Sequence, residues 1–145
     1  MCTNRNLHYV GTDPNPDTAG RYENVAKFYN DNVLGKNKFW SDSEPNTYDV
    51  FSDGSEEIGN NPKFQKYKGK LDFVFTSPPY FNREQYSQDE NQSFKKFEVY
   101  EDWRDNFLRP TLTTAYKYLK NNRYICWNIA DIKIGSDKYI PLFFS

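Results

Sequence analysis

The residues best suited to chemistry in this sequence form one short segment, Thr76-Ser77-Pro78-Pro79-Tyr80. Two consecutive prolines restrict the backbone and cannot continue a strand, so a sharp turn is predicted after the apolar run that precedes them. Such a turn would hold the Ser77 hydroxyl and the Pro78 carbonyl as two acceptors beside the Tyr80 ring. Acceptors beside a ring suit a planar base, whose amino group becomes a nucleophile only when its lone pair leaves the ring system. A base in a duplex would first have to be flipped out.

The elements that must position this segment can be read from the spacing of apolar residues. Short apolar and β-branched runs predict strands at 7–13, 48–51, 71–76 and 124–129. Apolar residues three and four apart predict helices at 18–34 and 100–120, with Pro110 as a kink or break in the second. Residues 83–98 are predicted to be a surface loop, and 139–143 begin a further apolar segment.

Strands that alternate with helices predict an α/β fold, in which a parallel sheet is covered by helices on its faces. Ligands of such sheets lie beyond the carboxyl ends of the strands. Asp13, Asp53 and the segment Ser77–Tyr80 each follow a predicted strand. We therefore expect them at one edge of the sheet. Trp103 and the other aromatic residues at helical spacing are expected in the core.

Composition excludes several other classes of protein. A chain of 145 residues has the size of one domain, and its net charge of -1 gives no overall attraction to a polyanion, so contact with nucleic acid must use local patches. The lysines at 63, 66, 68 and 70 are one such patch, either a solvated face or a phosphate contact.

Two cysteines and one histidine argue against a zinc site and against Ser-His-Asp chemistry. With no membrane span or signal peptide apparent, a cytoplasmic protein is expected.

On the residues Ser77-Pro78-Pro79-Tyr80, the sequence resembles the amino-directed DNA methyltransferases, whose motif is [Asp/Asn/Ser]-Pro-Pro-[Tyr/Phe/Trp]. The resemblance implies methyl transfer from S-adenosylmethionine to cytosine N4 or adenine N6 of DNA, with these four residues as the catalytic set. The serine form preceded by threonine is similar to the members that methylate cytosine, although serine also occurs in the adenine enzymes.

Further matches follow in the order of the family. The stretch that ends at Asp13 resembles the acidic strand end that binds the ribose hydroxyls of the cofactor, since a carboxylate suits a diol. Asp53-Gly54-Ser55 resembles the segment that contacts the adenine ring, so Asp53 and Ser55 join Asp13 as expected cofactor contacts. Residues 128–131 resemble the end of the strand after the catalytic one. The implied fold is a Rossmann-like methyltransferase sheet with helices on both faces.

One family element has no counterpart: the glycine-rich Phe-x-Gly-x-Gly loop, expected before the Asp13 strand. In the family sheet its strand lies between the Asp13 strand and the Ser77 strand. We therefore expect residues 1–145 to be a partial methyltransferase catalytic domain that lacks the first and final strands and is inactive alone. The open sheet edge that results would favour self-association.

Three alternatives stay open on the sequence. Pro-Pro-Tyr sites also serve amino groups of RNA and of proteins, although those relatives usually carry Asn at the position of Ser77. A degenerate methyltransferase fold that serves as a non-catalytic interaction module would also explain the missing glycine loop. A Pro-Pro-Tyr peptide can be a ligand for WW-type domains, which would require Pro79 and Tyr80 to be exposed and flexible.

Overall fold

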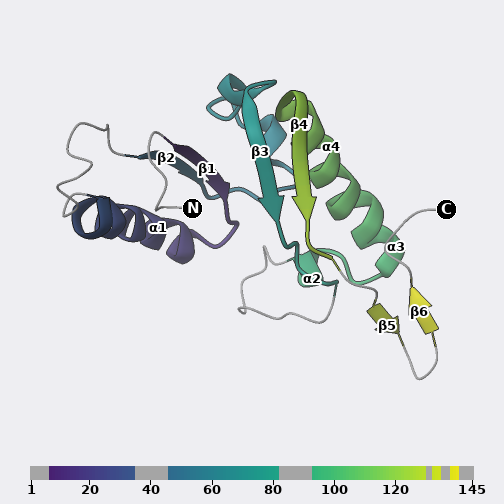
Figure 1. Ribbon diagram of the computed structural model, residues 1–145. Helices are drawn as coiled ribbons and strands as arrows, with labels where there is room; N and C mark the ends of the chain where they lie inside the picture. The colour runs from purple at the N-terminus through teal and green to yellow at the C-terminus, as the bar shows by residue number, and fades with distance from the viewer. Residues whose placement is uncertain (1–6, 35–45, 82–92, 130–131, 135–137, 141–145) are drawn as a thin grey trace. The chain divides into compact units, whose positions relative to one another are not determined.

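The computed structural model describes residues 7–34, 46–81, 93–129, 132–134 and 138–140 (Figure 1). The chain divides into two compact units, residues 1–54 and 55–145, which are described in turn. Asp131 and most of the predicted loop 83–98 lie outside the described residues.

The first unit is a strand-helix-strand motif. Strand β1 (His8–Thr12) and strand β2 (Thr47–Phe51) pair in parallel, from His8 opposite Thr47 to Thr12 opposite Phe51. Helix α1 (Pro16–Tyr29) follows β1 and continues as the π-helical turn η1 (Asn30–Leu34). Two parallel strands need such a crossover, because the chain must return to the starting end of the sheet before the second strand begins. A tight turn only reverses the chain direction and so joins antiparallel strands. The predicted strands and helix are confirmed to within two residues at their ends.

Helix α1 begins two residues earlier than predicted, because the Asp-Pro-Asn-Pro segment is a helix cap as well as a turn. The side chain of Asn15 accepts a hydrogen bond from the Asp17 amide at 3.0 Å. Pro16 occupies the first helical turn, where its missing N–H leaves no donor unsatisfied. A cap of this kind lets the chain leave β1 and enter the helix within three residues.

The second unit contains the strand that precedes the double proline. After two short 3-10 turns, η3 (Ile58–Asn60) and η4 (Gln65–Tyr67), comes strand β3 (Leu71–Thr76), as predicted. The short helices α2 (Ser93–Lys96) and α3 (Tyr100–Trp103) lead through the π-helical turn η5 (Arg104–Leu108) into helix α4 (Arg109–Tyr118). Helix α2 falls within the predicted loop and was not expected.

Strand β4 (Leu119–Trp127) completes a second parallel pair, with Phe73 opposite Tyr124 and Thr76 opposite Trp127. It begins five residues before the predicted strand, and an irregularity between Leu71 and Phe73 absorbs the extra length. Strands β5 (Ile132–Ile134) and β6 (Lys138–Ile140) form an antiparallel hairpin that the sequence did not predict.

The predicted helix 100–120 is interrupted rather than simply kinked. Pro110 lies in the first turn of α4, and the wide turn η5 stands directly before it. A proline cannot donate to the carbonyl four residues back and its ring collides with that carbonyl, so a locally widened helix accommodates it. The helix also ends at Tyr118, because Leu119 is already extended.

Two aromatic groups form most of the core of the second unit. The larger group, which we call the aromatic cluster, has the fully buried Trp103 at its centre. Its members are Phe81, Tyr100, Trp103, Phe107 and Leu108. In the smaller group, the rings of Phe64 and Tyr118 stack with centroids 4.4 Å apart. The expectation that Trp103 belongs to the core is confirmed.

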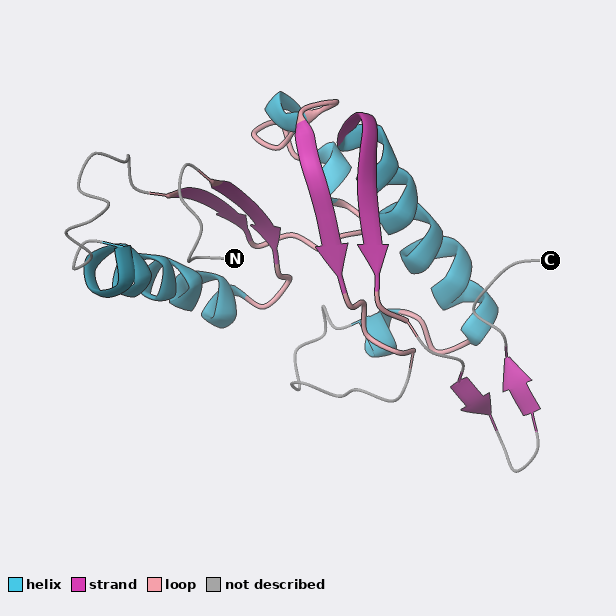
Figure 2. Ribbon diagram, in the orientation of Figure 1, coloured by secondary structure: helices cyan, strands magenta, loops and turns pink. Residues whose placement is uncertain are grey.

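The architecture is therefore mixed α/β, with parallel strands joined through helices, as predicted. The described strands form three sheets of two strands each, in place of the one larger sheet that the sequence suggested (Figure 2). Within the second unit, α4 lies along one side of the β3–β4 pair, while Phe73, Phe75 and Tyr124 on the strands are exposed. Helices on both faces are thus not seen in the described part of this unit.

Candidate functional site

The double-proline segment lies at the carboxyl end of β3, where the adjacent β4 also ends. The Asn128 amide donates to the Thr76 carbonyl at 2.9 Å, which extends the strand pairing by one residue. The Asn128 side chain then donates from Nδ2 to Ser77 Oγ at 3.3 Å. Ser77 is exposed, so its hydroxyl is oriented by the neighbouring strand and still open to a ligand.

The segment turns as soon as the strand ends. The Phe81 amide donates to the Pro79 carbonyl at 2.9 Å, which closes a three-residue turn around Tyr80. Phe81 has a φ of 45°, a left-handed conformation that is strained for an aromatic residue. Burial of its ring in the aromatic cluster compensates for that strain, since only 4% of Phe81 is exposed. The Pro78 carbonyl does not take part in the hydrogen bond that closes this turn.

The aromatic cluster also restrains Tyr80. The Tyr80 ring packs against the cluster and is half-buried, and Pro78 is buried. Beneath them, the Phe81 ring meets Tyr100 edge-on at a centroid distance of 5.8 Å and Trp103 at 5.9 Å. Pro79 and Tyr80 are thus only partly exposed, and Tyr80 is packed against the cluster, which argues against use of the segment as an extended peptide ligand.

The second predicted group, Asp13 with Asp53, lies at the carboxyl end of the β1–β2 pair in the first unit. The Asp13 amide donates to the Phe51 carbonyl at 3.0 Å, and the Thr12 hydroxyl donates to the Asp53 carbonyl. The strand pairing thus places these two aspartates at the same end of the β1–β2 pair. The β3–β4 pair is a separate sheet, so the common edge with Ser77–Tyr80 stays a prediction.

The Asp13 carboxylate already has two donors. Its Oδ1 accepts from the Asn15 amide at 2.9 Å, and its Oδ2 accepts from the Tyr22 hydroxyl at 3.4 Å. The pKa of Tyr22 is raised, first by burial and then by the charge and hydrogen bond of Asp13. A carboxylate has about four acceptor positions, so Asp13 keeps the capacity to accept from a diol.

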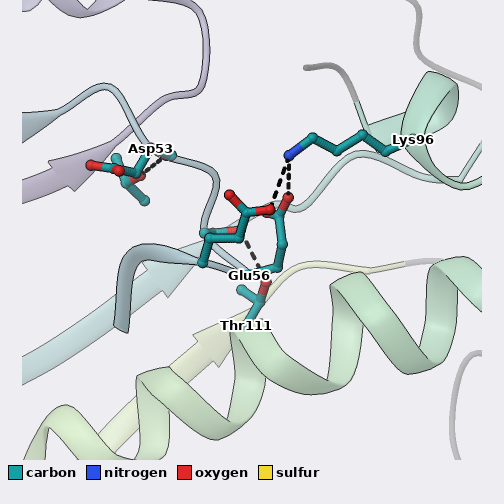
Figure 3. Close-up of polar contacts among 7 residues, drawn as sticks. Asp53, Glu56, Lys96 and Thr111 are labelled. Carbon is teal, nitrogen blue, oxygen red and sulfur yellow. Dashed lines mark hydrogen bonds and ion pairs between the residues drawn. The ribbon is translucent and has the colours of Figure 1, made fainter. Parts of the chain in front are cut away.

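Ser55 does not share the surroundings of Asp53. It belongs to the second unit, where its hydroxyl lies 3.0 Å from the hydroxyl of Thr111 on α4 (Figure 3). Thr111 is the buried polar residue of that helix. The contact gives Ser55 a structural role, and its predicted contact with a cofactor remains a prediction.

An ion pair that sequence reasoning missed lies beside Ser55. Lys96 Nζ on α2 is 3.2 Å from Glu56 Oε1 and 3.3 Å from Glu57 Oε1, and only 6% of the Glu56 side chain is exposed (Figure 3). Burial opposes the charge of Lys96, but the hydrogen bonds and charges of the two glutamates outweigh it and raise the pKa of Lys96. The partners are 40 residues apart, and no local pattern indicates their contact.

Among the described residues, no three or more His, Cys, Asp or Glu side chains form a group that could hold a metal ion. None of the helices in this part of the chain is both long and apolar enough to cross a membrane.

Comparison with known protein families gives one match. A family model described as DNA methylase, N6_N4_Mtase, matches residues 71–144, slightly more than half of the chain. The matched region begins at β3 and includes the double-proline turn, the aromatic cluster and β4. No significant match was found among curated proteins or among solved structures.

Proposed function

Because the chain belongs to the N6/N4 DNA methylase family, we propose that it carries the base-binding site for methyl transfer from S-adenosylmethionine to cytosine N4 or adenine N6 of DNA. The observation that carries this proposal is the turn Ser77–Tyr80, which is exposed at Ser77 and fixed by the aromatic cluster beneath Tyr80. A fixed turn can hold acceptors in place without reorganisation during the reaction.

Each residue of the turn has a role in this proposal. Ser77 Oγ and the Pro78 carbonyl accept the two N–H groups of the base, so that the lone pair of the amino nitrogen points out of the ring plane. Tyr80 stacks on the flipped base, and its packing against the aromatic cluster limits the entropy lost on binding. With the cofactor bound, the amino nitrogen would attack its methyl carbon: the N–C bond would form as the methyl–sulfur bond breaks, the sulfonium would leave as a neutral thioether, and the nitrogen would release one proton to solvent.

For the cofactor, the chemistry of the donor set in the first unit fits S-adenosylmethionine. Asp13 is a carboxylate at a strand end with acceptor capacity left, which suits the two ribose hydroxyls. Asp53 follows the adjacent strand β2, and its carbonyl accepts from the Thr12 hydroxyl. When bound, the cofactor supplies an electrophilic methyl group. We assign Asp13, Asp53 and Ser55 to the cofactor, with Ser55 the least supported because it contacts Thr111.

A non-catalytic interaction module is the second candidate, and one observation favours it. The sequence contains no Phe-x-Gly-x-Gly segment to approach the methionine part of the cofactor. We therefore propose that these 145 residues alone bind the base but transfer methyl groups poorly or not at all.

Base recognition can be tested without the cofactor. We expect Ser77→Ala to weaken binding to a cytosine- or adenine-containing single strand about tenfold, the loss of one hydrogen bond of about 1.4 kcal/mol. Fluorescence anisotropy measures this, and Thr113→Ala, which removes an exposed hydroxyl of α4, is the matched control. An abasic strand should bind both variants equally. If Ser77→Ala bound the cytosine strand and the adenine strand each as tightly as Thr113→Ala does, the proposal would be contradicted.

Cofactor binding is tested separately by calorimetric titration of S-adenosylmethionine into the chain. Only weak binding is expected, because Asp13 and Asp53 can hold the ribose but no Phe-x-Gly-x-Gly segment is present to approach the methionine part. Tight one-to-one binding would show a complete cofactor site, and nucleoside analysis of DNA and RNA, with amino-acid analysis of protein, would then identify the acceptor.

A further inference from the structure

The end of the second unit that lies opposite the double-proline turn is strongly basic. Four lysines, at 63, 66, 68 and 70, precede β3, and Lys117, Lys120 and Arg123 lie at the end of α4 and the start of β4. The β3–β4 pairing brings the two groups together, because the Lys70 amide donates to the Tyr118 carbonyl at 3.0 Å and Leu71 pairs with Leu119. We call these seven residues the basic edge.

Little negative charge balances the basic edge. Asp72 is the sole acid in residues 61–72, and residues 106–123 contain none. Asp72 is shared between Lys120, at 2.8 Å, and Arg123, at 3.1 Å, and their hydrogen bonds lower its pKa. Within the described residues, Lys63, Lys68, Lys70 and Lys117 have no ion-pair partner. This excess of positive charge contrasts with the net charge of -1 for the whole chain.

Two exposed aromatic residues are sequence neighbours of these cations. Tyr116 precedes Lys117 and is 75% exposed, and Tyr124 follows Arg123 and is 76% exposed. All seven cationic residues are exposed as well. Cations that track a phosphate backbone beside aromatic rings that can stack on bases or sugars are the usual combination in nucleic-acid-binding surfaces.

We propose that the basic edge is a second DNA-binding surface, which contacts the phosphate backbone without reading the base sequence. Strand β3 has six residues, so about 20 Å separate the basic edge from Ser77, and the edge cannot touch the base held at the turn. The proposal goes beyond the proposed function, since this contact needs neither the cofactor nor the double-proline turn. Its contribution is to hold the chain on DNA through charge.

The test is a pair of charge-matched variants of the full chain. Lys68→Gln/Lys70→Gln removes two cations of the basic edge, and Arg21→Gln/Lys27→Gln removes two exposed cations of α1. Binding to a fluorescein-labelled duplex of mixed sequence is followed by anisotropy at increasing salt. If each lysine contacts one phosphate, the negative slope of log K against log salt becomes shallower by about 1.8 in the first variant. The α1 variant should keep the slope of the parent chain.

Three outcomes would overturn the proposal. Equal loss in both variants would show that net charge alone governs binding, and no detectable binding by the parent chain would leave nothing to assign to the edge. Competition by polyglutamate as strong as that by DNA, at equal charge, would show a general site for acidic polymers. The base-recognition experiment with Ser77→Ala uses other residues and a neutral change, so the two proposals fail independently.

Discussion

At the residue scale, the double-proline turn shows how a short motif depends on residues outside it. Its prolines and Tyr80 are recognisable in the sequence, but Asn128, which donates to Ser77 Oγ at 3.3 Å, follows a different strand, β4. Phe81 adopts its left-handed φ of 45° because its ring is buried in the aromatic cluster. The motif supplies the acceptors, and its neighbours set their direction.

The Lys96–Glu56 pair permits a prediction on stability and pH. We expect Lys96→Met to lower the free energy of unfolding by about 1–3 kcal/mol, because it leaves the buried Glu56 carboxylate without its charged partner. The folded pKa of Lys96 is raised above the ordinary value of 10.5, so the stability that it adds is fully present below that pH. As the pH rises through the folded pKa, the charge of Lys96 and this stability are both lost.

Urea denaturation of the parent chain and of Lys96→Met over a range of pH measures this difference. It should be constant near neutral pH and shrink in alkali. Lys68→Met, at an exposed position, is the control and should change stability by at most about 0.5 kcal/mol. A difference between the parent and Lys96→Met that persists at high pH would show that Lys96 acts through packing rather than charge.

At the scale of elements, the aromatic cluster joins α3, η5 and the double-proline turn. Trp103 is its centre, with 0% exposure, and its ring stacks on Phe107 at a centroid distance of 5.8 Å. Among the described residues, the Trp103 Nε1 is one of two buried side-chain polar atoms without a hydrogen-bond partner. The indole therefore contributes through its packed surface, while its N–H carries an uncompensated cost of burial.

This imbalance predicts different effects for two substitutions. Trp103→Ala should lower the free energy of unfolding by about 3–5 kcal/mol, the usual cost of emptying such a site. Trp103→Phe keeps an aromatic ring and removes the unpartnered donor, so its cost should be below about 1.5 kcal/mol. Urea denaturation followed by circular dichroism measures both. Similar costs for the two variants would indicate that the N–H has a partner after all.

At the scale of the whole molecule, the buried apolar side chains are distributed unequally. In the described residues Phe51 is the buried apolar residue of the first unit, and the other nine belong to the second. In the first unit, Tyr9, Val25 and Phe28 remain exposed to between 39% and 58%. Two strands and a helix with so little burial are only marginally stable on their own.

We therefore expect the first unit to open more readily than the second. Amide hydrogen exchange followed by mass spectrometry should show faster exchange in β1 and β2 than in β3 and β4. The β3–β4 peptides are the internal reference, since they are measured in the same sample. Equal protection of both strand pairs would mean that the two units unfold together.

The sequence by itself determined the local features: the strands at 7–13, 48–51 and 71–76, the helix predicted at 18–34, and the double-proline turn. These follow from the spacing of apolar residues and from the geometry of proline, which act over a few residues. The same spacing placed Trp103 in the core. The family resemblance rested on the turn, and the family model that begins at residue 71 confirms it.

The tertiary structure alone decided the contacts between distant residues. The pairs Lys96 with Glu56, Ser55 with Thr111 and Asn128 with Ser77 join segments 40 to 56 residues apart, and no local pattern indicates them. The basic edge likewise forms because β3 and β4 pair in parallel, which places the lysines before one strand beside the cations that begin the other. Strand register and helix packing set such contacts, and both depend on the whole set of surfaces buried together.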